Sequence, residues 1–189
     1  MYYHASQTEG IRCLQPRVSN HGIPLVYLSA KRENVLVYLS NAVEKCCKET
    51  GFAHTGNWTK WGPYGFTKEG ILRLEEYYPN ALEDTYKGVR ACIYAADVTE
   101  GIRKLEGIPY AYVSESPVPV QSCELIPDAY AQILQAQEKG EIVICRYADM
   151  TQSQLQWIHD TAVQEYTDEK TAADYKYFLL NKFPFLRTI

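Results

Sequence analysis

The order of two apolar patterns along the chain constrains its fold most strongly. Short apolar runs rich in β-branched and aromatic residues, typical of strands, occupy the first two thirds, as at residues 23–28 and 118–125. Apolar residues at helical spacing dominate the last third. Because a doubly wound parallel sheet needs alternating strands and helices, this segregation predicts an α+β fold. We expect an α+β domain over residues 1–125 and a mostly helical C-terminal segment over residues 126–189 packed on it.

Capping signals place several helix boundaries. Residues 31–48 carry an apolar stripe at helical spacing, with Ser29 as a plausible N-cap and Gly51 at the C-cap position. The segment 151–154, Thr-Gln-Ser-Gln, has the pattern of a capping box and predicts the start of another helix. A last helix is expected over residues 168–180, ending before a proline.

Charge and composition exclude several classes of protein. The net charge is -4 and no segment concentrates Lys and Arg, so nonspecific nucleic-acid binding is disfavoured, while a specific RNA or DNA substrate stays open. No apolar run approaches the roughly 20 residues of a membrane span. The N-terminus has neither the basic nor the apolar region of a signal peptide. We therefore expect a soluble cytoplasmic protein whose six cysteines are reduced.

Common metal and nucleotide motifs do not occur in this chain. None of its four histidines has a second histidine at metal-ligand spacing, so no metal site is expected. There is no Gly-x-Gly-x-x-Gly segment and no Walker loop, which argues against Rossmann and P-loop nucleotide binding. His159 lies on an apolar helical stripe and is expected to be a hydrogen-bonded core histidine.

Two segments carry polar residues where an apolar strand is expected. His4 follows two tyrosines at the start of the chain, and a titratable ring in a strand needs a hydrogen-bond partner or a ligand. Tyr27 and Ser29 end an apolar strand that leads into the helix expected from residue 31. Free backbone N–H groups at the start of a helix favour the binding of phosphates, and a tyrosine ring can stack on a planar ligand ring. This arrangement, with an aromatic ring beside a helix start, indicates a location suited to a ligand that carries phosphates.

At these residues the chain resembles the ADP-ribosyltransferase superfamily. It looks most like the small bacterial branch that includes rifampin ADP-ribosyltransferases and RNA 2'-phosphotransferases. The segment Tyr3-His4-Ala5-Ser6 resembles the family's aromatic-His-Gly-Thr/Ser element. The segment Val26-Tyr27-Leu28-Ser29 resembles its Val-Tyr-Leu-Thr/Ser strand, which leads into a helix. A Ser-x-x-Pro-Leu/Val element is similar to residues 114–120. In order of elements the resemblance covers about residues 1–125, and in detail only these short motifs.

The resemblance implies a split antiparallel sheet with helices and a site for NAD as co-substrate. It places a ribose hydroxyl of NAD on His4 and the nicotinamide amide on the backbone at Ala5, with Ser6 in the same element. It stacks the nicotinamide ring on Tyr27, and it puts Ser29 near the same ribose or at the helix cap. These residues would hold the glycosidic bond for cleavage, with ADP-ribose passing to an acceptor that the sequence does not identify.

The chain departs from the family's pattern at two points. Ala5 stands where the family has Gly, which narrows the approach of the nicotinamide. The acidic third member of the site, which would stabilise the positive charge that develops on the ribose, is not evident. Glu124 is the first candidate for this catalytic role beside His4 and Tyr27, and Asp97 and Glu115 follow.

Several alternatives remain open from the sequence. The chain is an NAD-dependent ADP-ribosyltransferase, a catalytically inactive relative, or a protein-interaction module. His4 is alternatively a half-exposed terminal residue, and Tyr27 alternatively ordinary core. The loop with Trp58 and Trp61 is either a substrate lid or a hairpin pinned to the core. The C-terminal helices either cover an open sheet edge or support a homodimer.

Overall fold

The computed structural model describes residues 1–18, 22–56 and 64–189, which form two compact units. Unit 1 contains Met1–Ser40, Tyr64–Arg73 and Tyr86–Val143, and unit 2 contains Asn41–Pro63, Leu74–Thr85 and Ile144–Ile189. The units therefore interleave along the chain, whereas the sequence pattern predicted one boundary at residue 125. Segments from the first half of the chain belong with the C-terminal helices, and local patterns do not reveal this.

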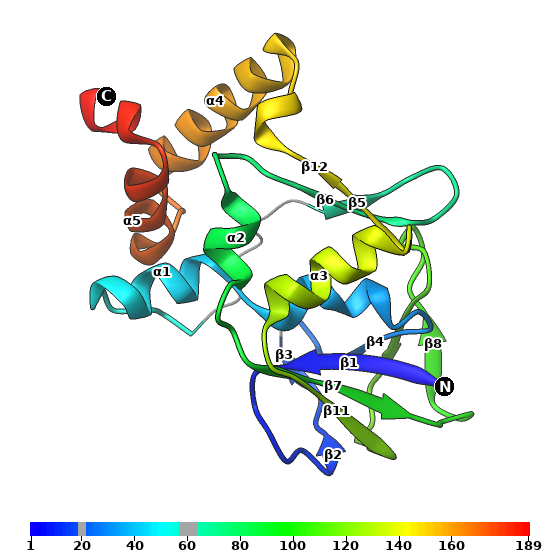
Figure 1. Ribbon diagram of the computed structural model, residues 1–189. Helices are drawn as coiled ribbons and strands as arrows, with labels where there is room; N and C mark the ends of the chain where they lie inside the picture. The colour runs from blue at the N-terminus through cyan, green and yellow to red at the C-terminus, as the bar shows by residue number, and fades with distance from the viewer. Residues whose placement is uncertain (19–21, 57–63) are drawn as a thin grey trace. The chain divides into compact units, whose positions relative to one another are not determined.

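Unit 1 is built on an antiparallel sheet with strand order β11-β7-β1-β4-β9-β8, while β3 also pairs with β4 (Figure 1). The strands are β1 (Tyr2–Ser6), β3 (Arg17–Val18), β4 (Pro24–Ser29), β7 (Ala91–Ala96), β8 (Ile102–Lys104), β9 (Ala111–Ser114) and β11 (Ser122–Ile126). With the helices of both units, this sheet confirms the α+β class.

Apolar layers cover both faces of this sheet. On one face, Val26, Leu28 and Ala96 pack with Leu14 of β2 (Cys13–Leu14) and Val118 of β10 (Val118–Pro119). On the other face lies the 3₁₀ helix η1 (Glu33–Leu39), which contacts β1, β4 and β7 and is contacted by α3 (Ala129–Glu138). Figure 1 shows η1 and α3 above the sheet and β2 below it. Every residue of β7 is consequently buried.

The single helix expected over residues 31–48 is wrong, because the structure has two. The 3₁₀ helix η1 ends at Leu39, and α1 (Ala42–Thr50) starts as a separate α-helix. Asn41 has an extended backbone, and its side chain accepts the backbone N–H of Glu44, so it caps a new helix. The expected C-cap is confirmed at Gly51, whose φ of 71° is left-handed.

A second, three-stranded sheet has the order β12-β6-β5. Its strands are β5 (Tyr64–Phe66), β6 (Leu72–Glu75) and β12 (Ile142–Cys145). The boundary between the units falls within β6 and β12. The short helix α2 (Ala81–Tyr86) follows β6 and was not predicted from the sequence.

Of the helices in unit 2, α4 (Gln152–Thr167) begins where its capping signal placed it, whereas α1 and α5 (Ala173–Lys182) begin later than expected. The remaining elements are η2 (Tyr147–Asp149) and η3 (Pro184–Thr188). The capping box is confirmed, because Thr151 Oγ1 accepts the Gln154 N–H and the Gln154 side chain accepts the Thr151 N–H. The last helix begins later than expected, because the Thr171 N–H closes a turn onto the Asp168 carbonyl.

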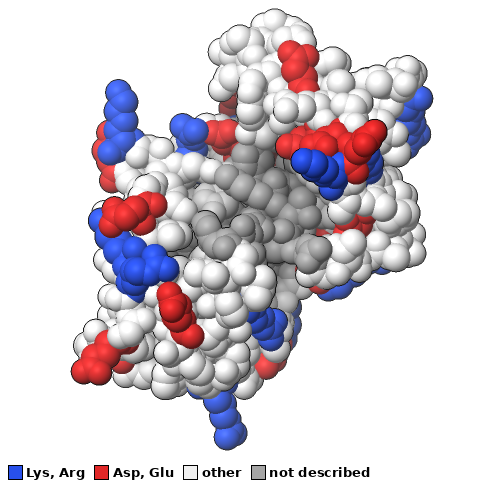
Figure 2. All heavy atoms as spheres, turned by 180° about the vertical axis from the view of Figure 1, so that it is seen from behind, with Lys and Arg blue, Asp and Glu red and all other residues white. Residues whose placement is uncertain are grey.

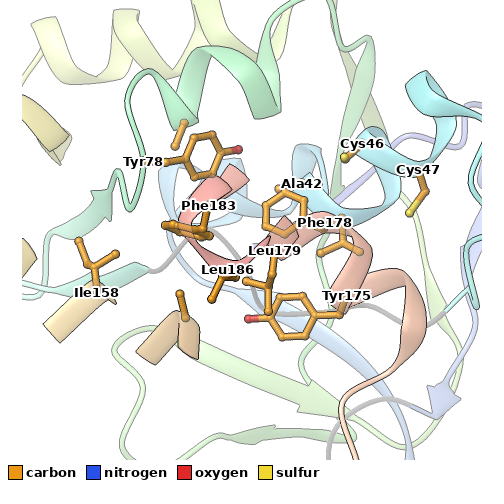
Figure 3. Packing of buried hydrophobic residues seen from close by; sticks show 13 residues of the cluster. Ala42, Cys46, Cys47, Tyr78, Ile158, Tyr175, Phe178, Leu179, Phe183 and Leu186 are labelled. Carbon is orange, nitrogen blue, oxygen red and sulfur yellow. The ribbon is translucent and has the colours of Figure 1, made fainter. Parts of the chain in front are cut away.

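The core of unit 2 is aromatic and aliphatic (Figure 3). Phe178 and Leu179 of α5 are fully buried. The ring of Tyr78 meets the rings of Phe178 and Phe183 edge-on, with both ring-centre distances at 6.1 Å. His159 is not part of this core, contrary to expectation, because its side chain is 48% exposed and stacks on Phe185 at the surface. No helix within the described residues is long and apolar enough to cross a membrane.

Leu179→Ala tests the packing of this core. The variant leaves a cavity beside Phe178, so we expect it to lower the free energy of unfolding by about 2–5 kcal/mol. Its neighbour Leu180 is only partly buried, and Leu180→Ala makes the matched control with a smaller loss. Urea unfolding followed by circular dichroism measures both. Equal losses of unfolding free energy for the two variants would contradict the assignment of Leu179 to the core-facing side of α5.

Candidate functional site

The two motifs with candidate site residues lie on neighbouring strands that pair weakly. β1 pairs with β7 along its whole length, from Tyr2 to Ser6. Among the described residues, β1 shares only one register pair with β4, that of Tyr3 and Ser29. We call this junction the β1–β4 seam. Backbone groups at such a seam need partners from outside the ladder, because a buried carbonyl without a hydrogen bond is costly.

The imidazole of His4 supplies such a partner. Its Nδ1 lies 2.9 Å from the carbonyl oxygen of Tyr27. A carbonyl oxygen only accepts, so Nδ1 carries the proton and donates it. Burial lowers the pKa of His4, the bond to Tyr27 opposes this shift, and the positive charge of Arg17 adds to the lowering. The ring is therefore held in its neutral form, and the expected need of His4 for a polar partner is met by backbone.

The rings of His4 and Tyr27 leave the sheet on opposite faces. Tyr3 and Ser29 are register partners and share one face, and Tyr27 shares it because it lies two residues before Ser29. His4 follows Tyr3 and so belongs to the other face, the one with the Leu28 packing layer. The structure thus joins His4 to the backbone of Tyr27 but does not bring the two rings together over one ligand ring.

Tyr27 lies near a cluster of phenols that the sequence analysis did not single out. The hydroxyls of Tyr38 and Tyr64 are 2.7 Å apart, and their rings meet edge-on at 5.8 Å. Burial raises the pKa of Tyr38, with further contributions from Tyr64, Tyr86 and Tyr27. The Tyr86 hydroxyl donates to the Val37 carbonyl at 2.9 Å. The high tyrosine content of the chain, 16 residues, was the only signal in the sequence for this cluster of phenols.

The remaining predicted contact residues make local hydrogen bonds. Ala5 is buried and pairs with Ile93 of β7. Ser6 Oγ accepts the N–H of Thr8 at 3.1 Å. Ser29 Oγ accepts the N–H of Lys31 at 3.0 Å, so it closes a turn before η1 and does not cap an α-helix. Both hydroxyls therefore stabilise the chain reversals that follow β1 and β4.

Glu124, the first candidate for the catalytic acid, lies far from Tyr27. It sits on β11, and β7 and β1 separate this strand from β4. Three strand spacings amount to about 14 Å. Its carboxylate forms a bidentate pair with Arg32, with Nε–Oε2 at 2.8 Å and Nη2–Oε1 at 2.7 Å. This pair ties β11 to the start of η1 and raises the pKa of Arg32.

The two other acidic candidates also have partners. Asp97 faces the N-terminal amine at 3.8 Å. Glu115 faces Arg103 at 3.9 Å, and both side chains are exposed. Glu115 lies nearest to Tyr27 along the sheet, because Val113 is the register partner of Tyr27. Its exposure leaves it poorly placed to stabilise charge in a dry site.

Two further expectations concern metals and the tryptophan loop. Within residues 1–18, 22–56 and 64–189, no group of three or more His, Cys, Asp or Glu side chains is arranged to hold a metal ion. Trp58 and Trp61, proposed above as parts of a lid or a pinned hairpin, lie outside the described residues.

The lowered pKa of His4 predicts a pH dependence of stability. The unfolded chain takes up the His4 proton near the ordinary pKa of 6.5, and the folded chain does so only at lower pH. The free energy of unfolding should therefore fall as pH drops from about 8 to about 5.5. His4→Gln, which retains a donor for the Tyr27 carbonyl, should flatten this fall in urea titrations. His159→Gln at an exposed ring is the control, and identical profiles for wild type and His4→Gln would contradict the assignment.

Comparison with known proteins assigns no family to this geometry. No protein-family model matches the sequence. Searches of curated proteins and of solved structures also find no match. The function of the β1–β4 seam therefore has to be argued from its own contacts and from the motifs in the sequence.

Proposed function

We propose that unit 1 binds NAD beside Tyr27, as an ADP-ribosyltransferase-like protein. One observation carries this proposal: the two motifs on which the resemblance rests meet at the β1–β4 seam. His4 of the first motif is hydrogen-bonded to Tyr27 of the second across 23 residues of sequence. Each motif alone is a short sequence pattern, and this contact between them supports a shared role in one site.

The proposal gives the two residues different tasks. Tyr27 stacks on the nicotinamide ring, and the nearby phenols of Tyr38 and Tyr64 extend the aromatic surface. His4 is a positioning residue, because its Nδ1 is occupied and its ring belongs to the opposite face. By holding the Tyr27 carbonyl, it sets the backbone from which the stacking ring projects.

The positions of the carboxylates favour binding over efficient transfer. Cleavage of the nicotinamide–ribose bond passes through a positively charged state that a nearby carboxylate stabilises. Glu124, Asp97 and Glu115 are each engaged by a cation, and Glu124 is remote. We therefore propose NAD as a bound ligand first, and transfer of ADP-ribose to an acceptor only as the second candidate activity.

Calorimetric titration with NAD tests the binding site. We expect Tyr27→Ala to weaken NAD binding about tenfold or more, because loss of one stacked ring costs about 1–3 kcal/mol. Tyr27→Phe keeps the ring and should bind as wild type does. His4→Ala should weaken binding through the displaced backbone, whereas His4→Gln should restore it. Thermal unfolding checks that each variant is folded. A wild-type protein that does not bind NAD would refute the proposal.

Release of nicotinamide from NAD tests the second candidate activity. Because Arg32 holds Glu124 about three strands from Tyr27, we expect Glu124→Gln to leave the rate of release unchanged. Chromatographic detection of free nicotinamide gives the rate for wild type and variant. A wild-type rate well above background that Glu124→Gln removes would restore Glu124 as the catalytic acid.

A further inference from the structure

Unit 2 has an open hollow of about 560 Å³ between α2 and the end of α5. Its volume falls within the range of about 300–1,000 Å³ typical of small-molecule pockets. Apart from Pro79, the described residues that line it carry polar or charged groups: Tyr78, Asn80, Glu83, Asp84, Asn181 and Lys182. We propose that this hollow binds a neutral ligand rich in hydroxyl groups, of the chemical class of a monosaccharide ring.

Asp84 is held in place at the hollow by two donors. Its Oδ2 accepts the Tyr78 hydroxyl at 2.6 Å and is 2.7 Å from Lys182 Nζ. Tyr78 is only 6% exposed, and burial raises its pKa, so its hydroxyl remains a donor. The Asp84 side chain is itself 35% exposed. Both bonds use Oδ2, which leaves Oδ1 as an acceptor for a ligand.

Lys182 is equally well fixed. Its side chain is 18% exposed, and Nζ lies over the rings of Tyr78 and Phe178, 5.5 and 6.0 Å from their centres. A lysine restrained by a carboxylate and two rings has lost most of its rotamer freedom already in the free protein. Its remaining N–H donors can therefore bind a ligand oxygen at a low entropic cost.

Two carboxamides line the hollow on either side. Asn181 Nδ2 donates to the Tyr177 carbonyl at 2.9 Å, which orients the amide and leaves its oxygen as an acceptor. Asn80 has a φ of 58°, a left-handed conformation that Asn tolerates better than most residues. Its carbonyl accepts the Asp84 N–H at 2.9 Å and so starts α2. Acceptors and donors thus converge from two helices.

The charges of the lining select the class of ligand. A free cation is disfavoured because the ammonium group of Lys182 already neutralises Asp84. An anion is disfavoured because the Asp84 carboxylate lines the same hollow and repels it. A hydroxyl carries no charge and both donates and accepts, so neighbouring hydroxyls on a ring match a mixed lining. The ring of Pro79 adds apolar surface for the C–H groups of a sugar.

Nuclear magnetic resonance titration of the full chain tests this inference. The probes are methyl α-D-glucopyranoside for a glycan source and adenosine for a nucleoside source of the same ring hydroxyls. We expect saturable shifts of the Asn80 and Asn181 side-chain amides, with a dissociation constant in the millimolar range for at least one probe. Spermidine and inorganic phosphate should cause none at these amides.

Matched variants separate this site from nonspecific effects. Asn80→Gly keeps the left-handed backbone, and Asn181→Ala suits a helix, so both should fold. Each should weaken sugar binding about fivefold, as expected for one lost hydrogen bond. Gln164→Ala, an exposed amide on α4, should change nothing. Absence of saturable sugar binding, preference for spermidine or phosphate, or unchanged affinity in both variants would each overturn the inference. NAD binding by unit 1 is measured separately and does not decide it.

Discussion

Burial of β7 on both faces is the constraint on which unit 1 depends. All six of its residues are buried, and four of them are Ala or Cys, which lets apolar layers approach closely. The one polar side chain is Tyr94, whose hydroxyl donates to the Thr8 carbonyl and accepts the Ile11 N–H. β7 in turn pairs with β1 at every residue of that strand. Pairing is therefore regular on this edge of β1, whereas on its other edge the described residues of β1 and β4 share a single register pair.

The β1–β4 seam shows how such an irregularity is stabilised. The strands share one register pair, and the His4 imidazole satisfies a backbone acceptor beside it. A neutral, half-buried imidazole can do this without the desolvation cost of a charge. The same contact brings the two sequence motifs together, while the Tyr27 side chain lies near the neighbouring phenol of Tyr38. The proposed ligand site therefore depends on a local departure from regular pairing.

In unit 2, buried carboxylates satisfy backbone N–H groups, as His4 satisfies a backbone carbonyl in unit 1. Asp174 is almost fully buried and accepts the backbone N–H and the hydroxyl of Thr55. Glu76 accepts the Leu82 N–H and pairs with Arg146 at 3.3 Å. Asp174 thus joins segments that are far apart in sequence, and so does Glu76 through Arg146. The bond between Glu76 and Leu82 is local. These hydrogen bonds explain why a unit assembled from separated segments can be compact, because each buried charge is compensated by several donors.

The sequence by itself determined the α+β class, the strand that ends at Ser29, the caps at Thr151 and Gly51, and the need of His4 for a polar partner. These properties depend on neighbouring residues, whose periodicity and capping groups are local. Only the tertiary structure decided that the rings of His4 and Tyr27 lie on opposite faces and that Arg32 holds Glu124. Strand register and contacts between distant segments decide those features, and a shift of one residue exchanges the two faces of a strand.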